Sequence, residues 1–236
     1  MDQLFSDDLK GRGILVRREG ATPNQVSFAA DHVSETYSQF IAQYGYCMMF
    51  DGRFQFCPIE RFRPLAALIF KADPDFSHND CHIVGFSAFG SLIYAWSEKH
   101  DFVKIDLLKY RIECNTLAPD VLDMSIFEDD DPPRPQNRES LTRLILPFEE
   151  NDCDIRDYDD NLMYAQCAKA CGALEYGQVY GFFPSLGFVG YKTKFRSVEN
   201  INRVKALEHF AMIAQMQDFH LVRYNMGRDE IVRPIG

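Results

Sequence analysis

Hydrophobic and polar positions in the first part of the chain predict a helix, a hairpin and a second helix. Apolar residues recur at helical spacing through residues 22–44, after a Thr-Pro helix start and before a glycine. Apolar segments within residues 46–57 then flank Asp51-Gly52, a favoured pair for a hairpin turn. Residues 58–71 suit a short helix that two prolines bracket and that an Asp-Pro-Asp sequence ends.

Three segments rich in aromatic and β-branched residues follow at 81–89, 92–96 and 102–108. Short polar breaks separate them, which is typical of consecutive antiparallel strands. A further strand is expected at 110–114.

The second half of the chain is less regular. Its residues 128–136, EDDDPPRPQ, are too charged and proline-rich for a helix or strand, so we expect a solvated loop. Ser197 is positioned to cap a long helix with an apolar face from Val198 to Ala214. The remaining expectations are helices at 140–146 and 161–171, strands joined by tight turns at 176–190, and a closing strand at 220–224.

These elements predict an α+β fold with antiparallel sheets and flanking helices, because no alternating βαβ pattern is found. We expect two closely packed subdomains, residues 1–114 and 115–236, with an acidic, proline-rich loop at about 127–139.

Composition favours a globular protein of the cytoplasm. Hydrophobic residues make up 46% and charged residues 25% of the 236-residue chain. The first ten residues are acidic where a secretory signal would be basic, and the apolar runs are too short to span a bilayer. Seven cysteines without a CxxC pair suit reduced thiols.

The net charge of −10 is concentrated in one stretch. Residues 128–160 hold twelve acidic residues and four arginines, whereas residues 161–236 hold six acidic and nine basic residues. Such a distribution is expected to repel nucleic acid and to attract a basic protein surface. The alternative is that the acidic stretch only keeps the protein soluble.

The strongest enzyme-like motif is the group His78, Cys81 and His82, whose side chains can bind zinc. In a strand, however, Cys81 and His82 would point to opposite faces. No P-loop, GxGxxG or GxSxG motif is present. We therefore expect no catalytic residue, no metal ligand and no cofactor, and we keep a metal-dependent hydrolase that uses these three residues as the alternative.

Two segments carry a resemblance to a known family. Tyr180-Gly181-Phe182 with Pro184 and Leu186, followed by Val204, Ala206, Glu208 and His209 on a helix, resemble the C-terminal domain of immunity proteins that neutralise type VI secretion DNase toxins. Val189-Gly190 departs from the Gly-Gly pair of that pattern. Upstream, Tyr44-Gly45, Asp51-Gly52 and residues 75–98 resemble the GAD-like domain that precedes it.

The resemblance implies a protein that is not an enzyme and that binds a cognate DNase toxin, with no direct contact to nucleic acid or membrane. A general binding or regulatory module of the same fold is a further alternative. Carboxylates can occupy a groove in which a nuclease holds phosphates, so the expected partner contacts are acidic. They are Glu128, Asp129, Asp130, Asp131, Asp152, Asp154, Asp157, Asp159 and Asp160.

Overall fold

The computed structural model describes residues 16–121 and 149–236. The loop expected at about 127–139 and the helix expected at 140–146 lie outside the described residues. The described parts form helices and mostly antiparallel sheets, which confirms the α+β class. None of the helices in these two ranges has the length and apolar character needed to cross a membrane.

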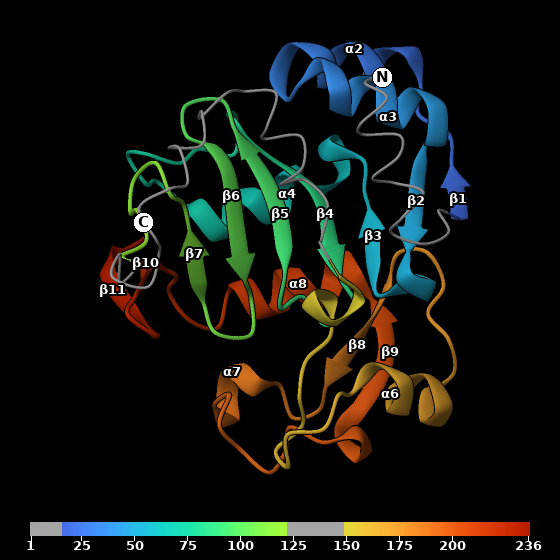
Figure 1. Ribbon diagram of the computed structural model, residues 1–236, viewed down its shortest axis with the longest axis vertical. Helices are drawn as coiled ribbons and strands as arrows, with labels where there is room; N and C mark the ends of the chain where they lie inside the picture. The colour runs from blue at the N-terminus through green and yellow to red at the C-terminus, as the bar shows by residue number, and fades with distance from the viewer. Residues whose placement is uncertain (1–15, 122–148) are drawn as a thin grey trace, which may run out of the picture.

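A nine-stranded sheet forms the centre of the molecule, in the order β1-β2-β3-β4-β5-β6-β7-β10-β11 (Figure 1). Neighbouring strands are antiparallel except β7 and β10, which are parallel. The predicted hairpin, the three consecutive strands and the strand at 110–114 are confirmed. The strand expected at 220–224 is also present, but a further strand, β11, follows it and closes the sheet. The strands are β1 (Val16–Glu19), β2 (Tyr46–Met49), β3 (Phe54–Phe56), β4 (Cys81–Ser87), β5 (Ile93–Ser97), β6 (Asp101–Asp106), β7 (Arg111–Glu113), β10 (His220–Asn225) and β11 (Arg228–Pro234).

Both faces of this sheet are covered by helices. Successive side chains of β5 alternate between two cores: Ile93 packs with α4 (Ile59–Phe70) and α8 (Ala206–Ala214), while Tyr94 packs on the side of α2 (Pro23–His32) and α3 (Glu35–Tyr44). Figure 1 shows α4 behind the strands and α2 and α3 across the top of the view. The central strands are therefore buried on both faces.

The single helix expected over residues 22–44 is two helices. Thr22 caps α2 in a capping box with Gln25, and the helix ends at His32. Ser34 then adopts an extended conformation, and its hydroxyl accepts a hydrogen bond from the backbone N–H of Tyr37, which starts α3. Ser34 therefore acts as a helix N-cap within a stretch that helical periodicity alone treats as continuous.

The rest of the C-terminal half forms a smaller layer below the sheet in Figure 1. It contains α6 (Tyr164–Cys171), the antiparallel pair β8 (Gln178–Phe182) and β9 (Ile201–Lys205), and the short helix α7 (Leu186–Val189). Single 3-10 turns occur at Phe50–Gly52, Glu150–Cys153 and Val198–Asn200. A third core joins this layer to Met48, Ala88 and Phe89 of the sheet region.

The long helix expected from Ser197 is wrong in its first half, because residues 201–205 form β9. β9 pairs with β8 along its whole length, and Val204 lies opposite Val179. Of the expected helix, only Ala206–Ala214 is α-helical, and Val198–Asn200 is a single 3-10 turn. The strands expected over 176–190 are correct for β8, but α7 takes the place of a second one.

Buried polar contacts hold the smaller layer on the sheet. The fully buried Gln55 of β3 donates from Nε2 to the carbonyl of Gln178 at 2.8 Å and accepts from the N–H of Gly177 at 2.7 Å. The hydroxyl of Tyr164 donates to the carbonyl of Asp51 at 2.6 Å. The chain then returns through α8 and adds β10 and β11 beside β7, so the large sheet contains strands from both sides of the boundary predicted at residue 114.

Candidate functional site: an acidic loop and its surroundings

Residues 156–162, which include Asp157, Asp159 and Asp160, form a tight loop. An isolated bridge joins Arg156 to Leu162. Within the loop, one carboxylate oxygen of Asp157 accepts the backbone N–H groups of Asp159 at 2.9 Å and Asn161 at 2.8 Å. Asp157 therefore acts as an internal acceptor that sets the shape of the loop.

Arg196 fixes this loop to the smaller layer. Its guanidinium donates to the carbonyl of Asp157 at 3.1 Å and to that of Tyr191 at 2.8 Å, and it stacks 4.3 Å from the centre of the Tyr191 ring. Its own carbonyl accepts the N–H of Tyr158 at 2.8 Å. The backbone of the loop is thus held before any partner arrives, which lowers the entropy cost of binding.

The structure divides the predicted acidic contacts into two groups. Asp152, Asp159 and Asp160 are exposed. Asp154 and Asp157 are partly buried and accept backbone hydrogen bonds; Asp154 accepts the N–H of Tyr164 at the start of α6. Burial raises the pKa of Asp154, and its backbone donors act in the opposite direction. Glu128, Asp129, Asp130 and Asp131 lie outside the described residues.

The acidic pattern did not single out Tyr158. Its side chain is 50% exposed and is followed in the chain by the exposed Asp159 and Asp160. A tyrosine on a fixed loop offers a large contact area at a small entropy cost, and tyrosine is frequent among residues that dominate binding energy. The signal in the sequence is an aromatic residue inside an otherwise charged run.

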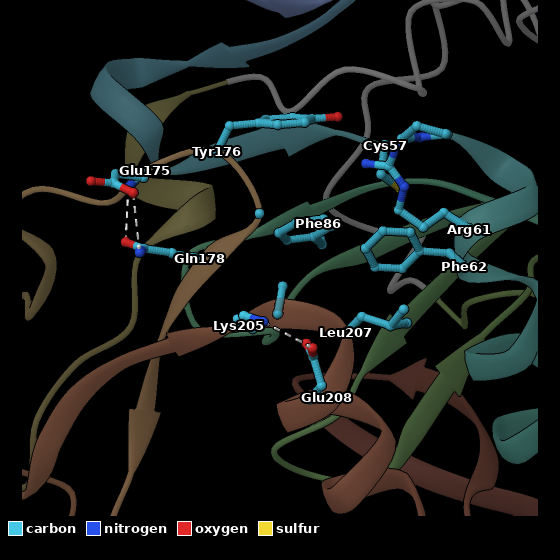
Figure 2. A pocket seen from close by; sticks show the side chains of 13 residues that line it. Cys57, Arg61, Phe62, Phe86, Glu175, Tyr176, Gln178, Lys205, Leu207 and Glu208 are labelled. Atoms are coloured by element: carbon cyan, nitrogen blue, oxygen red, sulfur yellow. Dashed lines mark hydrogen bonds and ion pairs between the residues drawn. The ribbon is translucent and has the colours of Figure 1, made fainter.

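A cavity of about 390 Å³ lies where the smaller layer meets the sheet (Figure 2). Its lining includes Arg61, Tyr176, Lys205 and Glu208. The charged groups are already paired: Arg61 binds Glu19 at 2.9 Å, and Lys205 lies 3.7 Å from Glu208. Burial raises the pKa of the lining thiol Cys57 well above its ordinary value, which makes it a poor nucleophile. We therefore interpret the cavity as a space between two packed layers and not as a catalytic site.

The hydrolase alternative is not supported by the placement of its residues. Cys81 packs in the core beneath α4, whereas His82 on the same strand lies against Phe28 of α2, with ring centroids 5.3 Å apart. The opposite-face prediction is confirmed. Among the described residues, His82 is grouped with His32 and Glu98 instead of with His78 and Cys81.

His209 is buried in α8 and is 7% exposed. A Cβ atom on Gly181 would lie 2.7 Å from the His209 ring, so β8 needs a glycine at this position. Burial lowers the pKa of His209 to about 4. These two residues of the resemblance motif thus maintain packing between β8 and α8.

This burial predicts an acid-sensitive stability. The unfolded chain binds a proton at His209 at a pKa of about 6.5, but the folded chain does so only at about 4, so the free energy of unfolding should fall as the pH drops through this window. Between about pH 7.5 and about pH 5 the expected loss from His209 is roughly 2 kcal/mol. Urea unfolding of wild type and His209→Gln at both pH values measures it. An equal pH dependence in the two proteins would contradict the assignment.

Comparisons with known proteins match two successive regions of the chain. Residues 3–109 match the GAD-like domain, and residues 138–217 match the C-terminal domain of the T6SS immunity protein Tdi1. Among solved structures, the crystal structure of Atu4351 from Agrobacterium tumefaciens is similar at 26% sequence identity and a TM-score of 0.81, over 98% of each chain. Comparison with curated proteins gives no match. The expected family and the order of its two parts are confirmed.

Proposed function

We propose that this chain, which belongs to the T6SS immunity proteins that join a GAD-like domain to a Tdi1 C-terminal domain, neutralises a cognate DNase toxin by covering its basic surface. An immunity family implies a toxin as partner, and we propose that this toxin is a DNase that contacts the acidic loop. The observation that supports it is the prefolded loop of residues 156–162, which exposes Tyr158 together with Asp159 and Asp160.

The charge of the loop suits a nuclease as partner. A DNase must hold phosphate groups with lysine and arginine side chains, so its substrate groove attracts carboxylates. Asp159 and Asp160 are exposed and can approach such a groove without rearrangement of the loop. Tyr158 then supplies the apolar contact that a purely electrostatic encounter lacks. We propose that the exposed Asp152 and the predicted contacts Glu128, Asp129, Asp130 and Asp131 extend the same acidic surface.

The basic test is protection during co-expression. Cells that produce the toxin encoded beside this gene should survive when they also produce this chain, and the two proteins should co-purify. Continued killing by a toxin with intact nuclease activity, despite abundant folded immunity protein, would contradict the proposal. That result would instead favour a general binding module of the same fold.

The loop itself is tested by removing its charge. The double variant Asp159→Asn/Asp160→Asn should associate with the toxin about 10-fold more slowly at low ionic strength, and the difference should shrink in high salt. Surface plasmon resonance with the catalytically inactive toxin measures the association rate at low and at high salt.

Tyr158→Ala should instead speed dissociation and weaken binding by about 10-fold or more, which the same measurement shows.

A matched control removes two exposed carboxylates elsewhere. Glu35→Gln/Glu208→Gln changes the net charge by the same amount but leaves the loop intact. Its association rate should stay close to that of wild type. If both double variants slow association equally, total charge accounts for the effect, and the loop is not the contact surface.

A further inference from the structure

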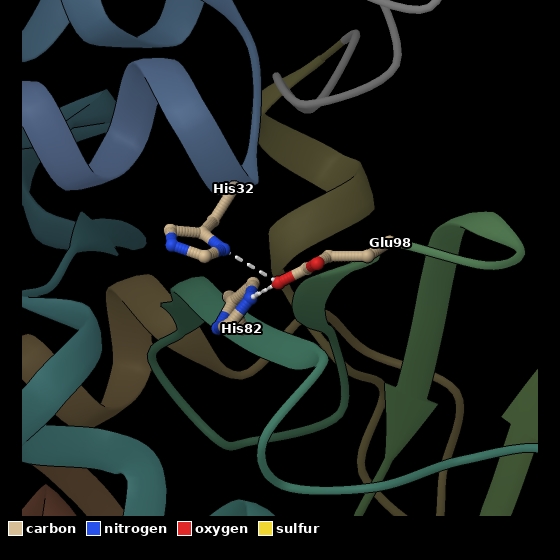
Figure 3. Close-up of side chains that lie close together, drawn as sticks. All are labelled: His32, His82 and Glu98. Carbon is tan, nitrogen blue, oxygen red and sulfur yellow. Dashed lines mark hydrogen bonds and ion pairs between the residues drawn. The ribbon is translucent and has the colours of Figure 1, made fainter.

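Three side chains with metal-binding atoms converge between α2 and the sheet (Figure 3). Nδ1 of His32 and Nε2 of His82 each lie 2.8 Å from the same carboxylate oxygen of Glu98. All three ligand atoms lie within 4.8 Å of one another. This group is distinct from the acidic loop and from the cavity at the junction.

Separate elements of the fold bring these residues together. His32 is the last residue of α2, and His82 lies on β4 opposite Trp96 of β5. Glu98 follows β5 directly, and its backbone N–H donates to the carbonyl of Asp80 at 2.8 Å. Because helix, strand and strand end are each fixed by packing, the three side chains are held near one another without a metal.

The donor set suits a borderline divalent transition metal. Two imidazoles and one carboxylate form a common ligand set for zinc with an open fourth position. The side chain of His82 is 1% exposed, while those of His32 and Glu98 are 39% and 37% exposed. An ion can therefore enter from solvent and keep a water molecule, and the buried His82 supplies a fixed ligand on the inner side.

The hydrogen bonds of His82 indicate how tightly such a site would hold a metal ion. Without a metal, both imidazoles must donate an N–H to one carboxylate oxygen, and Nδ1 of His82 then has no hydrogen-bond partner among the described residues. With a metal on Nε2, the proton of His82 moves to Nδ1, which still lacks a partner. Zinc ligands usually have such a partner, so the affinity should be lower than that of a structural zinc site.

We propose that His32, His82 and Glu98 bind one divalent transition-metal ion, with zinc as the best-fitting ion, and that the ion fastens α2 to the end of β5. The carboxylate of Glu98 moves aside from its place between the two nitrogens and becomes the third ligand. Because the ion binds only the folded state, the free energy of unfolding increases with the logarithm of the metal concentration once that concentration exceeds Kd.

The test is calorimetric titration of the metal-stripped full chain with zinc chloride, followed by thermal unfolding with and without zinc. We expect one saturable site per chain and a higher Tm with zinc. His32→Gln and Glu98→Gln change partly exposed side chains, and each should weaken zinc binding by at least about 10-fold. His78→Gln removes a nearby histidine outside the group and should leave the affinity unchanged.

Cobalt gives a second readout that does not depend on stability. The Co²⁺-loaded wild type should show visible absorption bands of a four- or five-coordinate nitrogen and oxygen site, and His82→Gln should lose them. The proposal is overturned if wild type has no saturable site, or if zinc binds His32→Gln and wild type equally. Protection against the toxin is not required in either assay, so failure of the metal site and failure of the proposed function are separable.

Discussion

Phe210→Ala is expected to lower the free energy of unfolding by about 3 to 5 kcal/mol. The Phe210 side chain is fully buried in α8 and packs edge-on against Phe86 of β4, with ring centroids 5.4 Å apart. Gly90 lies directly against this ring, because a Cβ there would come within 2.6 Å of it. Gly90 has no side chain to fill the space that alanine would leave, and Phe86 is held on a strand of the sheet. We therefore expect a cavity in the core.

The same variant measures whether the two matched regions unfold together. Phe210 belongs to the region that matches the Tdi1 C-terminal domain, whereas Phe86 and the single tryptophan, Trp96, belong to the GAD-like region. In urea unfolding, Trp96 fluorescence and far-ultraviolet circular dichroism should shift to the same lower midpoint.

Met212→Ala is the control on the same helix. Its side chain is 39% exposed, so the loss should be below about 1 kcal/mol. If Trp96 fluorescence keeps its wild-type midpoint in Phe210→Ala while the dichroism changes, the two regions unfold independently. The division predicted at residue 114 would then describe two folding units, in spite of the shared sheet.

Local patterns predicted the strands well because each carries its signal within a few residues. The segment around Ile93 is continuously apolar, and apolar and polar residues alternate around Val103; polar residues precede and follow each segment. The Asp51-Gly52 pair marks the turn of the hairpin. β9 was missed for the opposite reason. Ile201 and Val204 are three apart, which continues the helical pattern of α8, and only the pairing with β8 makes them a strand.

The candidate sites show the same contrast between local and distant information. The residues of the acidic loop are consecutive in the chain, so the sequence alone predicts its negative charge. The sequence does not show that Asp157 accepts hydrogen bonds within the loop instead of facing solvent. His32 and His82 are fifty positions apart in the chain and meet only because α2 lies over β4. The sequence suggested the neighbours His78 and Cys81 as partners of His82, since it gives no measure of proximity through the fold.

The C-terminal strand depends on a buried ion pair that also joins distant segments. Arg233 of β11 donates to both carboxylate oxygens of Asp73, at 2.5 and 3.0 Å, and to Asp75 at 2.5 Å. The Asp73 side chain is only 1% exposed. β11 is an edge strand with mostly exposed side chains, so this contact is a main attachment of the chain end to the turn after α4.

Arg233→Ala is expected to cost about 3 kcal/mol at neutral pH, because it leaves the Asp73 carboxylate buried without its cation. The backbone N–H groups of Asp75, Phe76 and Gly236 still reach this carboxylate, which places the loss at the lower end of the usual range. Urea unfolding measures the loss. Arg223→Ala removes the solvent-exposed partner of Glu230 on the neighbouring strand and should change stability little.

Acid distinguishes a buried-charge effect from a simple loss of packing. Burial raises the pKa of Asp73, but hydrogen bonds from Arg233 and the backbone outweigh it and hold the pKa below its ordinary value. In wild type, the stability from this pair is present above that ordinary value and is lost as the pH falls through the lower folded pKa. In Arg233→Ala, only the backbone hydrogen bonds oppose the effect of burial, so Asp73 is protonated at a higher pH than in wild type. The difference in free energy of unfolding between the variant and wild type should therefore narrow as the pH falls. Replacing Asp73 by Asn in the Arg233→Ala variant removes the unpaired charge and should recover part of the lost free energy of unfolding at neutral pH. If the difference in stability between Arg233→Ala and wild type is the same at every pH, the effect comes from packing of the arginine side chain.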